Sequence, residues 1–77
     1  MATVHDFELD VRGEASPYPL LKTKQRLEKL QKGEVLKVIA SNSVALQDID
    51  AWSKNSGNEL LEVEINGSIY NILILKG

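Results

Sequence analysis

Hydrophobic residues recur with two different periods in the first third of the chain. Phe7, Leu9 and Val11 alternate with acidic residues, and this period of two predicts a strand with one buried face. From residue 17 to about residue 31 the apolar positions recur every three or four residues, which predicts an amphipathic helix. The core-facing stripe of that helix consists of Leu20, Thr23, Leu27 and Leu30, with Leu21 at its edge.

The middle of the chain repeats the order of strand and helix. Residues 34–40, EVLKVIA, are nearly all apolar and rich in β-branched side chains, which predicts an interior strand parallel to the first. Residues 41–43 form a loop that ends in an N-cap candidate, Ser43, and Gly57 ends the second predicted helix, residues 44–56. The sheet-facing residues of that helix are predicted to be Ala45, Leu46, Ile49 and Trp52.

An Asn-Gly pair, Asn66-Gly67, separates two strand-like runs and is a strong hairpin signal. A two-residue turn there would place Ile65 opposite Ser68 and, further along, Val63 opposite Tyr70 and Leu61 opposite Ile72. These residues would share the core face. The opposite face carries acids together with an apolar set, Leu60, Ile69, Leu73 and Leu75.

The predicted order of elements is β-α-β-α-β-β. Two helices cannot cover both faces of a four-stranded sheet, so the expected fold is α+β, a two-layer α/β sandwich in which a mixed sheet carries both helices on one face. The apolar residues of the open face then need a cover. We expect a homo-oligomer or a partner protein on that face.

Composition and charge exclude several classes of function. The sequence has 77 residues, a net charge of −2, no cysteine and a single histidine, His5. We expect a single domain spanning residues 1–77, without a disulfide, a metal site or a cofactor, and the acidic charge argues against direct binding of nucleic acid. No apolar run is long enough to span a membrane and no signal-peptide pattern is present, so a cytoplasmic protein is expected.

The basic residues are concentrated on the first predicted helix. Residues 16–32 carry five cations, Lys22, Lys24, Arg26, Lys29 and Lys32, against one acid, Glu28. Lys22 and Arg26 lie off the apolar stripe. This helix face is either a solvated surface or a docking surface for an acidic partner.

The candidate chemistry lies in residues 9–20, LDVRGEASPYPL, where the first strand leads into the first helix. Pro17 and Pro19 fit the first and third positions of a helix, because the first four amides have no acceptor within it. Ser16 is then the expected N-cap. Its side chain would lie among free amides at the positive helix end, an environment that suits an anion or a thiolate.

The same stretch resembles the signature of the TusA/SirA/YeeD-like sulfur-carrier family, (L)D-x-x-G-x-x-C-P-x-P. Asp10, Gly13, Pro17 and Pro19 match at the family's spacing, and Ser16 stands where the family has its reactive cysteine. The resemblance covers essentially the whole chain. It implies a sheet in the order 1-2-4-3, with the fourth strand antiparallel to its neighbours.

The resemblance also implies a function. Residue 16 would carry sulfane sulfur as a persulfide between donor and acceptor proteins, or take part in processing thiosulfate beside a membrane permease. Pro17 and Pro19 would shape the helix end, Gly13 would let the turn approach, and Arg12 would place positive charge near an anionic sulfur species. A cysteine at position 16 is expected to have a pKa below that of a free cysteine.

Serine cannot carry out this chemistry, because its hydroxyl is a poor nucleophile without a base and the chain has no second histidine. The chain as written is therefore an inactive Cys-to-Ser form, either an engineered replacement or a natural loss of the cysteine. The alternative is a binding or regulatory module of the same fold, without cysteine, that docks an acidic or anionic partner.

Overall fold

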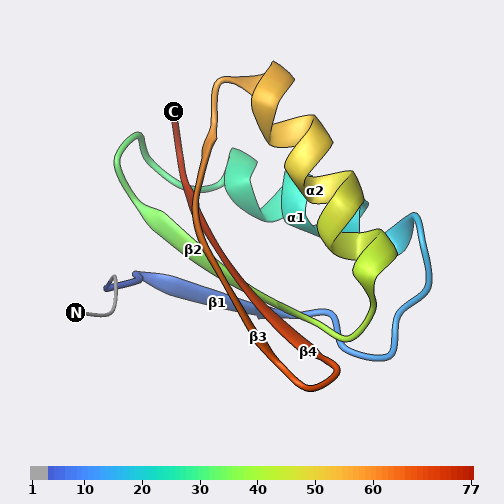
Figure 1. Ribbon diagram of the computed structural model, residues 1–77. Coiled ribbons are helices and arrows are strands. Elements are labelled where there is room, and N and C mark those ends of the chain that lie inside the picture. Colours follow the sequence, from blue (N-terminus) through green and yellow to red (C-terminus); the bar gives the residue numbers. More distant parts are fainter. Residues whose placement is uncertain (1–3) are drawn as a thin grey trace.

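The computed structural model describes residues 4–77, and within them the elements follow the predicted order (Figure 1). They are β1 (Phe7–Asp10), α1 (Tyr18–Glu28), β2 (Val35–Ala40), α2 (Ser43–Ser56), β3 (Glu59–Asn66) and β4 (Ile69–Leu75). The sheet order is β1-β2-β4-β3, with β1 parallel to β2 and β4 antiparallel to both of its neighbours. The expected α+β sandwich and strand order are confirmed.

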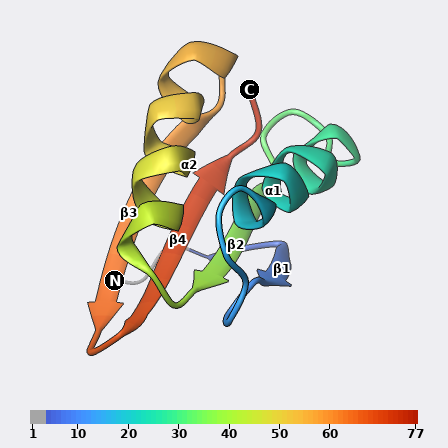
Figure 2. The same ribbon diagram turned by 90° about the vertical axis from the view of Figure 1, so that its right-hand side faces the viewer.

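The core lies between the sheet and the helices, which share one face of it. Figure 2 shows α1 over the β2 side of the sheet and α2 over the β3 and β4 side. Within β2, Leu36 and Val38 are fully buried beneath the helices, as the strand period requires. The helices contribute Leu27 and Ile49, and the hairpin contributes Ile72 and Ile74.

The boundaries of α1 differ from the prediction at both ends. Pro17 is the cap residue and makes no side-chain cap bond, so the predicted N-cap role of Ser16 and the first-position role of Pro17 are wrong. Pro19 is the second helical residue, not the third as predicted. The helix ends at Glu28, where the next amides bond to carbonyls three residues back rather than four. The helix therefore ends before the predicted end at about residue 31, and Gly33 lies in the turn before β2.

The start of α2 is capped one residue earlier than predicted. The side-chain oxygen of Asn42 accepts a hydrogen bond from the Ala45 amide at 2.8 Å, so Asn42 is the N-cap rather than Ser43. Gly57 ends the helix with φ +84°, as predicted. The predicted sheet-facing stripe is confirmed, with Ala45 and Ile49 buried and its other members half-buried against the core.

The hairpin turn lies one residue later than the Asn-Gly signal predicts. The turn residues are Gly67, at φ +61°, and Ser68, so that Ile65 pairs with Tyr70 and Val63 with Ile72. A glycine at the first central position suits a II′-type turn. The predicted register is therefore wrong by two residues, a shift that leaves Val63, Tyr70 and Ile72 on the core face. Ile65 is 57% exposed, so its predicted place in the core is wrong.

A bulge in β3 between Leu60 and Glu62 changes the faces beyond it. Leu60 packs against the core, so its predicted place on the open face is wrong, whereas Leu61 is 36% exposed and does not reach the core. Leu73 does lie on the open face, opposite Lys37 and Glu62, but is only 6% exposed. The open face is therefore less apolar than predicted, and its cover by a second chain stays a prediction.

Phe7 departs from the predicted pattern at the other edge of the sheet. It pairs with Leu36 at the start of the edge strand β1, so it lies on the predicted core-side face. It is nevertheless 41% exposed there, so its predicted burial is wrong. Leu9 and Val11, further along, do contact the core or lie in it. Within residues 4–77, neither helix has the length and the apolar character needed to cross a membrane.

Candidate functional site

Position 16 lies in the exposed loop between β1 and α1, at the right of Figure 1. The loop contains a turn in which the Glu14 amide donates to the Val11 carbonyl at 3.2 Å. Gly13 lies in this turn at φ +79°, a conformation that other residues resist, which is the angle that the sequence predicts. A Cβ at Gly13 would meet nothing within 4 Å, so the expected close approach at this glycine is wrong.

Three side-chain hydrogen bonds join this loop to the start of α2. The Gly13 amide donates to the Ser41 hydroxyl at 2.7 Å, and the Asn42 side-chain amide donates to the Glu14 carbonyl at 3.2 Å. The Ser16 hydroxyl donates to the Asp48 carboxylate at 3.0 Å. The position of Ser16 is therefore set by α2 as well as by its own helix.

The sequence pattern did not indicate that three residues on the α2 side, Ser41, Asn42 and Asp48, contact the loop that contains Ser16. A signal for the first two was available, because parallel strands joined by a helix end at the same edge of the sheet, where the loops that follow them meet. Asp48 had no such signal, since its contact with Ser16 depends on how α2 packs beside α1.

The start of α1 offers fewer free amides than the sequence predicts. Pro17 and Pro19 have no N–H, and the Tyr18 amide donates to the Ala15 carbonyl at 3.0 Å. The Leu21 amide donates to the Pro17 carbonyl at 3.1 Å. The expected collar of free donors around residue 16 is therefore smaller than predicted. The charged partner of the Ser16 side chain is the carboxylate of Asp48.

Arg12 pairs with Asp10 rather than with Ser16. Its Nε and Nη2 atoms donate to the two carboxylate oxygens of Asp10 at 3.0 and 2.7 Å. Hydrogen bonds from Arg12 lower the pKa of Asp10 from its ordinary value of 3.8 to about 2, and the carboxylate raises the pKa of Arg12. The positive charge of Arg12 is therefore paired with the Asp10 carboxylate.

Lys22 and Arg26 come together along one side of α1, as the sequence predicts. With Leu9, Gln25 and Lys29 they line a groove of about 240 Å³ between α1 and β1. Lys22 also pairs with Glu14 at 2.6 Å, and Arg26 donates to the Glu8 carbonyl at 3.4 Å. The groove is basic and shallow, and an acidic segment is the ligand class that its charge favours.

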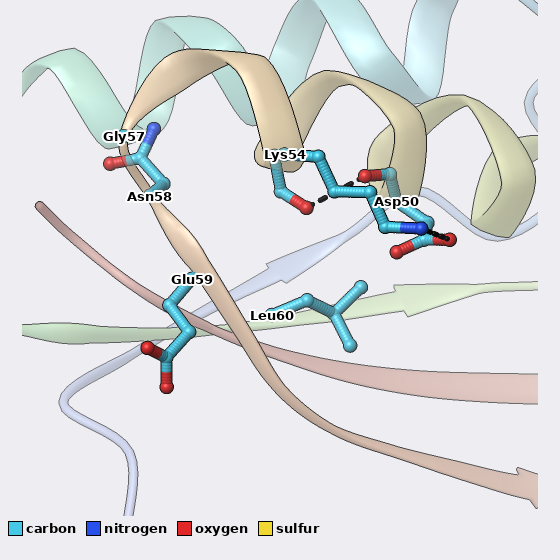
Figure 3. Close-up of a pocket in the computed structure, with 7 residues that line it drawn as sticks. Asp50, Lys54, Gly57, Asn58, Glu59 and Leu60 are labelled. Atoms are coloured by element: carbon cyan, nitrogen blue, oxygen red, sulfur yellow. Dashed lines mark hydrogen bonds and ion pairs between the residues drawn. The ribbon is translucent and has the colours of Figure 1, made fainter.

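A second hollow, of about 410 Å³, lies between the end of α2 and the start of β3 (Figure 3). Lys54 reaches Asp50 of the same helix there at 3.5 Å, and the buried Ser53 hydroxyl donates to the Asp50 carbonyl at 2.8 Å. None of the residues that line it belongs to the 9–20 stretch. It is separate from position 16 and adds nothing to the chemistry there.

Comparison with known proteins agrees with this architecture. The family described as "Sulfurtransferase TusA" matches residues 7–76. The sulfur carrier protein TusA of Allochromatium vinosum is 41% identical over 71 residues, a match that covers 92% of this chain and 93% of that protein. YrkI of Bacillus subtilis is 40% identical over 72 residues, covering 94% of this chain and 96% of that protein.

Two further comparisons differ in scope. YrkF of Bacillus subtilis is 41% identical over 69 residues, but the chain spans only 37% of its length. The crystal structure of a SirA-like protein from Desulfitobacterium hafniense superimposes with a TM-score of 0.83 and covers 94% of this chain and 99% of that one, at 22% identity, which supports the fold. The motif, the sheet order and the match over residues 7–76 together show that the chain belongs to the TusA family of sulfur-transfer proteins.

Proposed function

We propose that the chain is a small sulfur-transfer protein in which residue 16 is the sulfur-bearing position. The observation that carries this proposal is the exposed place of residue 16, in the loop between β1 and α1, within the family's motif. A sulfur atom there can meet both a donor and an acceptor without any opening of the fold.

The serine form does not hold sulfane sulfur. A hydroxyl is a weak nucleophile at neutral pH, and Asp48, its hydrogen-bond partner, is a carboxylate and too weak a base to ionise it. The chain as written is therefore the inactive form of a carrier, and Ser16→Cys restores the nucleophile.

With a thiol at position 16 the transfer is a thiol–disulfide type of exchange. The thiolate attacks the outer sulfur of a donor persulfide, the donor's S–S bond breaks, and the donor leaves as a thiolate. With thiosulfate the thiolate takes the outer sulfur and sulfite leaves. Neither step needs an oxidant or a reductant, because one S–S bond replaces another.

This function defines the partners and the compartment that we propose. The partners are sulfur donor and acceptor proteins in the cytoplasm, or a membrane permease that delivers a sulfur compound such as thiosulfate. The match to a family of sulfur carriers supports the first set, and the finer choice rests on the expectation from the motif.

Intact-mass spectrometry tests the proposal. The original protein and Ser16→Cys are incubated with a persulfide donor and, separately, with thiosulfate, and then treated with a reductant. We expect Ser16→Cys alone to gain the mass of one sulfur atom, and the reductant to remove it. No gain from either donor, at pH values where the thiol is ionised, contradicts the proposal.

A second candidate function is a binding module without sulfur chemistry. Two observations favour it, the satisfied hydroxyl of Ser16 and the basic groove that contains Lys22, Arg26 and Lys29. Such a module docks an acidic segment through the groove. Charge reversal in the groove distinguishes it, as described in the Discussion.

A further inference from the structure

We infer that Asp48 sets how readily position 16 holds an anionic sulfur. Its carboxylate suits the neutral hydroxyl of Ser16 and disfavours a thiolate or a persulfide anion at the same place. This inference deepens the proposed function, because it assigns control of the sulfur-bearing position to a residue of α2 that lies outside the motif.

A direct hydrogen bond places the Asp48 carboxylate at position 16. The Ser16 hydroxyl donates to the Asp48 carboxylate at 3.0 Å, and the two residues are 32 positions apart in the sequence. An ionised carboxylate accepts hydrogen bonds and has none to donate. A serine hydroxyl has one proton to give, so the pair is complementary. A thiolate has no proton, and the same carboxylate repels it.

The charged groups of the loop, α1 and α2 are arranged differently. Lys22 pairs with Glu14 and Arg12 with Asp10, whereas Lys24 of α1 lies over the Trp52 ring of α2, 5.8 Å from its centroid. Asp48 is the acid of α2 that reaches Ser16, and within the described residues it takes part in no ion pair. The charged group in direct contact with Ser16 is therefore negative.

Few backbone amides at the start of α1 offset the negative charge of this carboxylate. The prolines at positions 17 and 19 remove amides from the start of α1, and the Tyr18 amide is already bonded to Ala15. The usual stabilisation of a thiolate by a helix N-terminus is correspondingly weaker here. Within residues 4–77, the Asp48 carboxylate is the charged group that contacts the side chain at position 16.

The expected direction of the thiol's pKa is thereby reversed. Two unit charges about 4 Å apart repel by about 1 kcal/mol even in water, which lowers the thiolate fraction about fivefold, and by more where the surroundings are drier. The thiol introduced by Ser16→Cys is expected to have a pKa above that of a free cysteine. Removal of the Asp48 charge brings the pKa down.

The experiment compares three variants of the full chain. They are Ser16→Cys alone, Ser16→Cys with Asp48→Asn, and Ser16→Cys with Asp50→Asn. Asp48→Asn removes the charge at nearly constant size. Asp50→Asn is the matched control, because Asp50 lies on the same helix but pairs with Lys54.

The primary readout is the pH dependence of alkylation by iodoacetamide, which reports the thiolate without any sulfur transfer. We expect Asp48→Asn to lower the midpoint of the profile by about one pH unit, and Asp50→Asn to leave it nearly unchanged. Equal midpoints in all three variants, or an equal shift in the control, overturn the inference. Circular dichroism checks that each variant is folded.

Salt provides a second measurement that needs no change at Asp48. At about 1 M salt the screening length falls to about 3 Å, so repulsion between Asp48 and the thiolate weakens. The midpoint of Ser16→Cys is expected to fall with salt, and that of the Asp48→Asn double variant to change less. A midpoint that rises with salt in Ser16→Cys contradicts the inference.

Sulfur uptake separates this inference from the proposed function. If the midpoint moves but no variant takes up sulfur from a persulfide donor, the proposed function fails and the role of Asp48 stands. If Ser16→Cys takes up sulfur and Asp48→Asn changes neither its rate at pH 7 nor the midpoint, the role of Asp48 fails and the proposed function stands.

Discussion

The two helices of the chain begin in different ways. At the start of α2 the Asn42 side chain accepts a hydrogen bond from the Ala45 amide, so a residue of the chain itself caps the helix. At the start of α1 no side chain caps the helix, and Pro17 and Pro19 remove amides that would otherwise need partners.

This difference explains how position 16 differs from an ordinary helix cap. A side chain that caps a helix is held against backbone amides and is not available to another group. Prolines reduce the number of unpaired amides at the start of α1, and the Ser16 side chain does not cap this helix. Its hydroxyl instead donates a hydrogen bond to Asp48 of α2. The comparison thus separates a structural helix start from one that presents a side chain.

The largest predicted effect on stability comes from removing the cap of α2. Asn42→Ala removes the bond to the Ala45 amide and the bond to the Glu14 carbonyl, so we expect a loss of about 2 kcal/mol in the free energy of unfolding. Urea denaturation measures it. The matched variant Ser16→Ala, at the uncapped start of α1, is expected to lose less than about 1 kcal/mol. Equal losses would remove the distinction between the two helix starts.

The next prediction concerns the basic groove between α1 and β1, which α2 does not line. Reversal of Lys22 and Arg26 to Glu reverses the charge of the groove beside β1, and it should weaken binding of a short polyglutamate peptide and flatten its salt dependence. Calorimetric titration at low salt measures this. Lys37→Glu with Lys54→Glu changes the net charge equally but lies outside the groove, and should weaken binding less. If both pairs of reversals act alike, the groove is an ordinary solvated surface.

The smallest predicted effect lies at the exposed pair that precedes the loop. Hydrogen bonds from Arg12 hold the pKa of Asp10 at about 2, below its ordinary value of 3.8. A lowered pKa adds stability above the unfolded value, and this contribution disappears as the pH falls through the folded value. Arg12→Ala should therefore differ slightly in stability from the original protein above about pH 4, with the difference closing toward pH 2. Urea midpoints across this range measure it, and a difference that persists below pH 2 argues for another cause.

The architecture could be predicted because its signals are local. The alternation from Leu9 to Val11 and the helical stripe through Thr23 and Leu27 each follow from burial of one face, and these residues lie as predicted. The sheet order came from the likeness of the motif to a known family, and the structure has that order. No local pattern in the strands would have predicted this strand order.

Several of the errors depend on a contact between distant parts of the chain or on a choice between two residues of equal propensity. Asn42 and Ser43 are both good caps, and the turns at Asn66-Gly67 and Gly67-Ser68 are both good hairpins. The bulge at Leu61 changes the face of Leu60 without any marker in the sequence. The hydrogen bond from Ser16 to Asp48 spans 32 positions, so the sequence pattern could not show that a carboxylate lies beside the candidate site.

We propose that residue 16 is the sulfur-bearing position of this chain. The most direct test is intact-mass spectrometry of the original protein, Ser16→Cys, and Ser16→Cys with Asp48→Asn after incubation with a persulfide donor. We expect no added mass on the serine protein and a reductant-reversible gain of one sulfur atom on both thiol variants. The gain at pH 7 is expected to be faster when Asp48 is replaced. A serine protein that gains sulfur, or thiol variants that gain none while their thiols react with iodoacetamide, would contradict it.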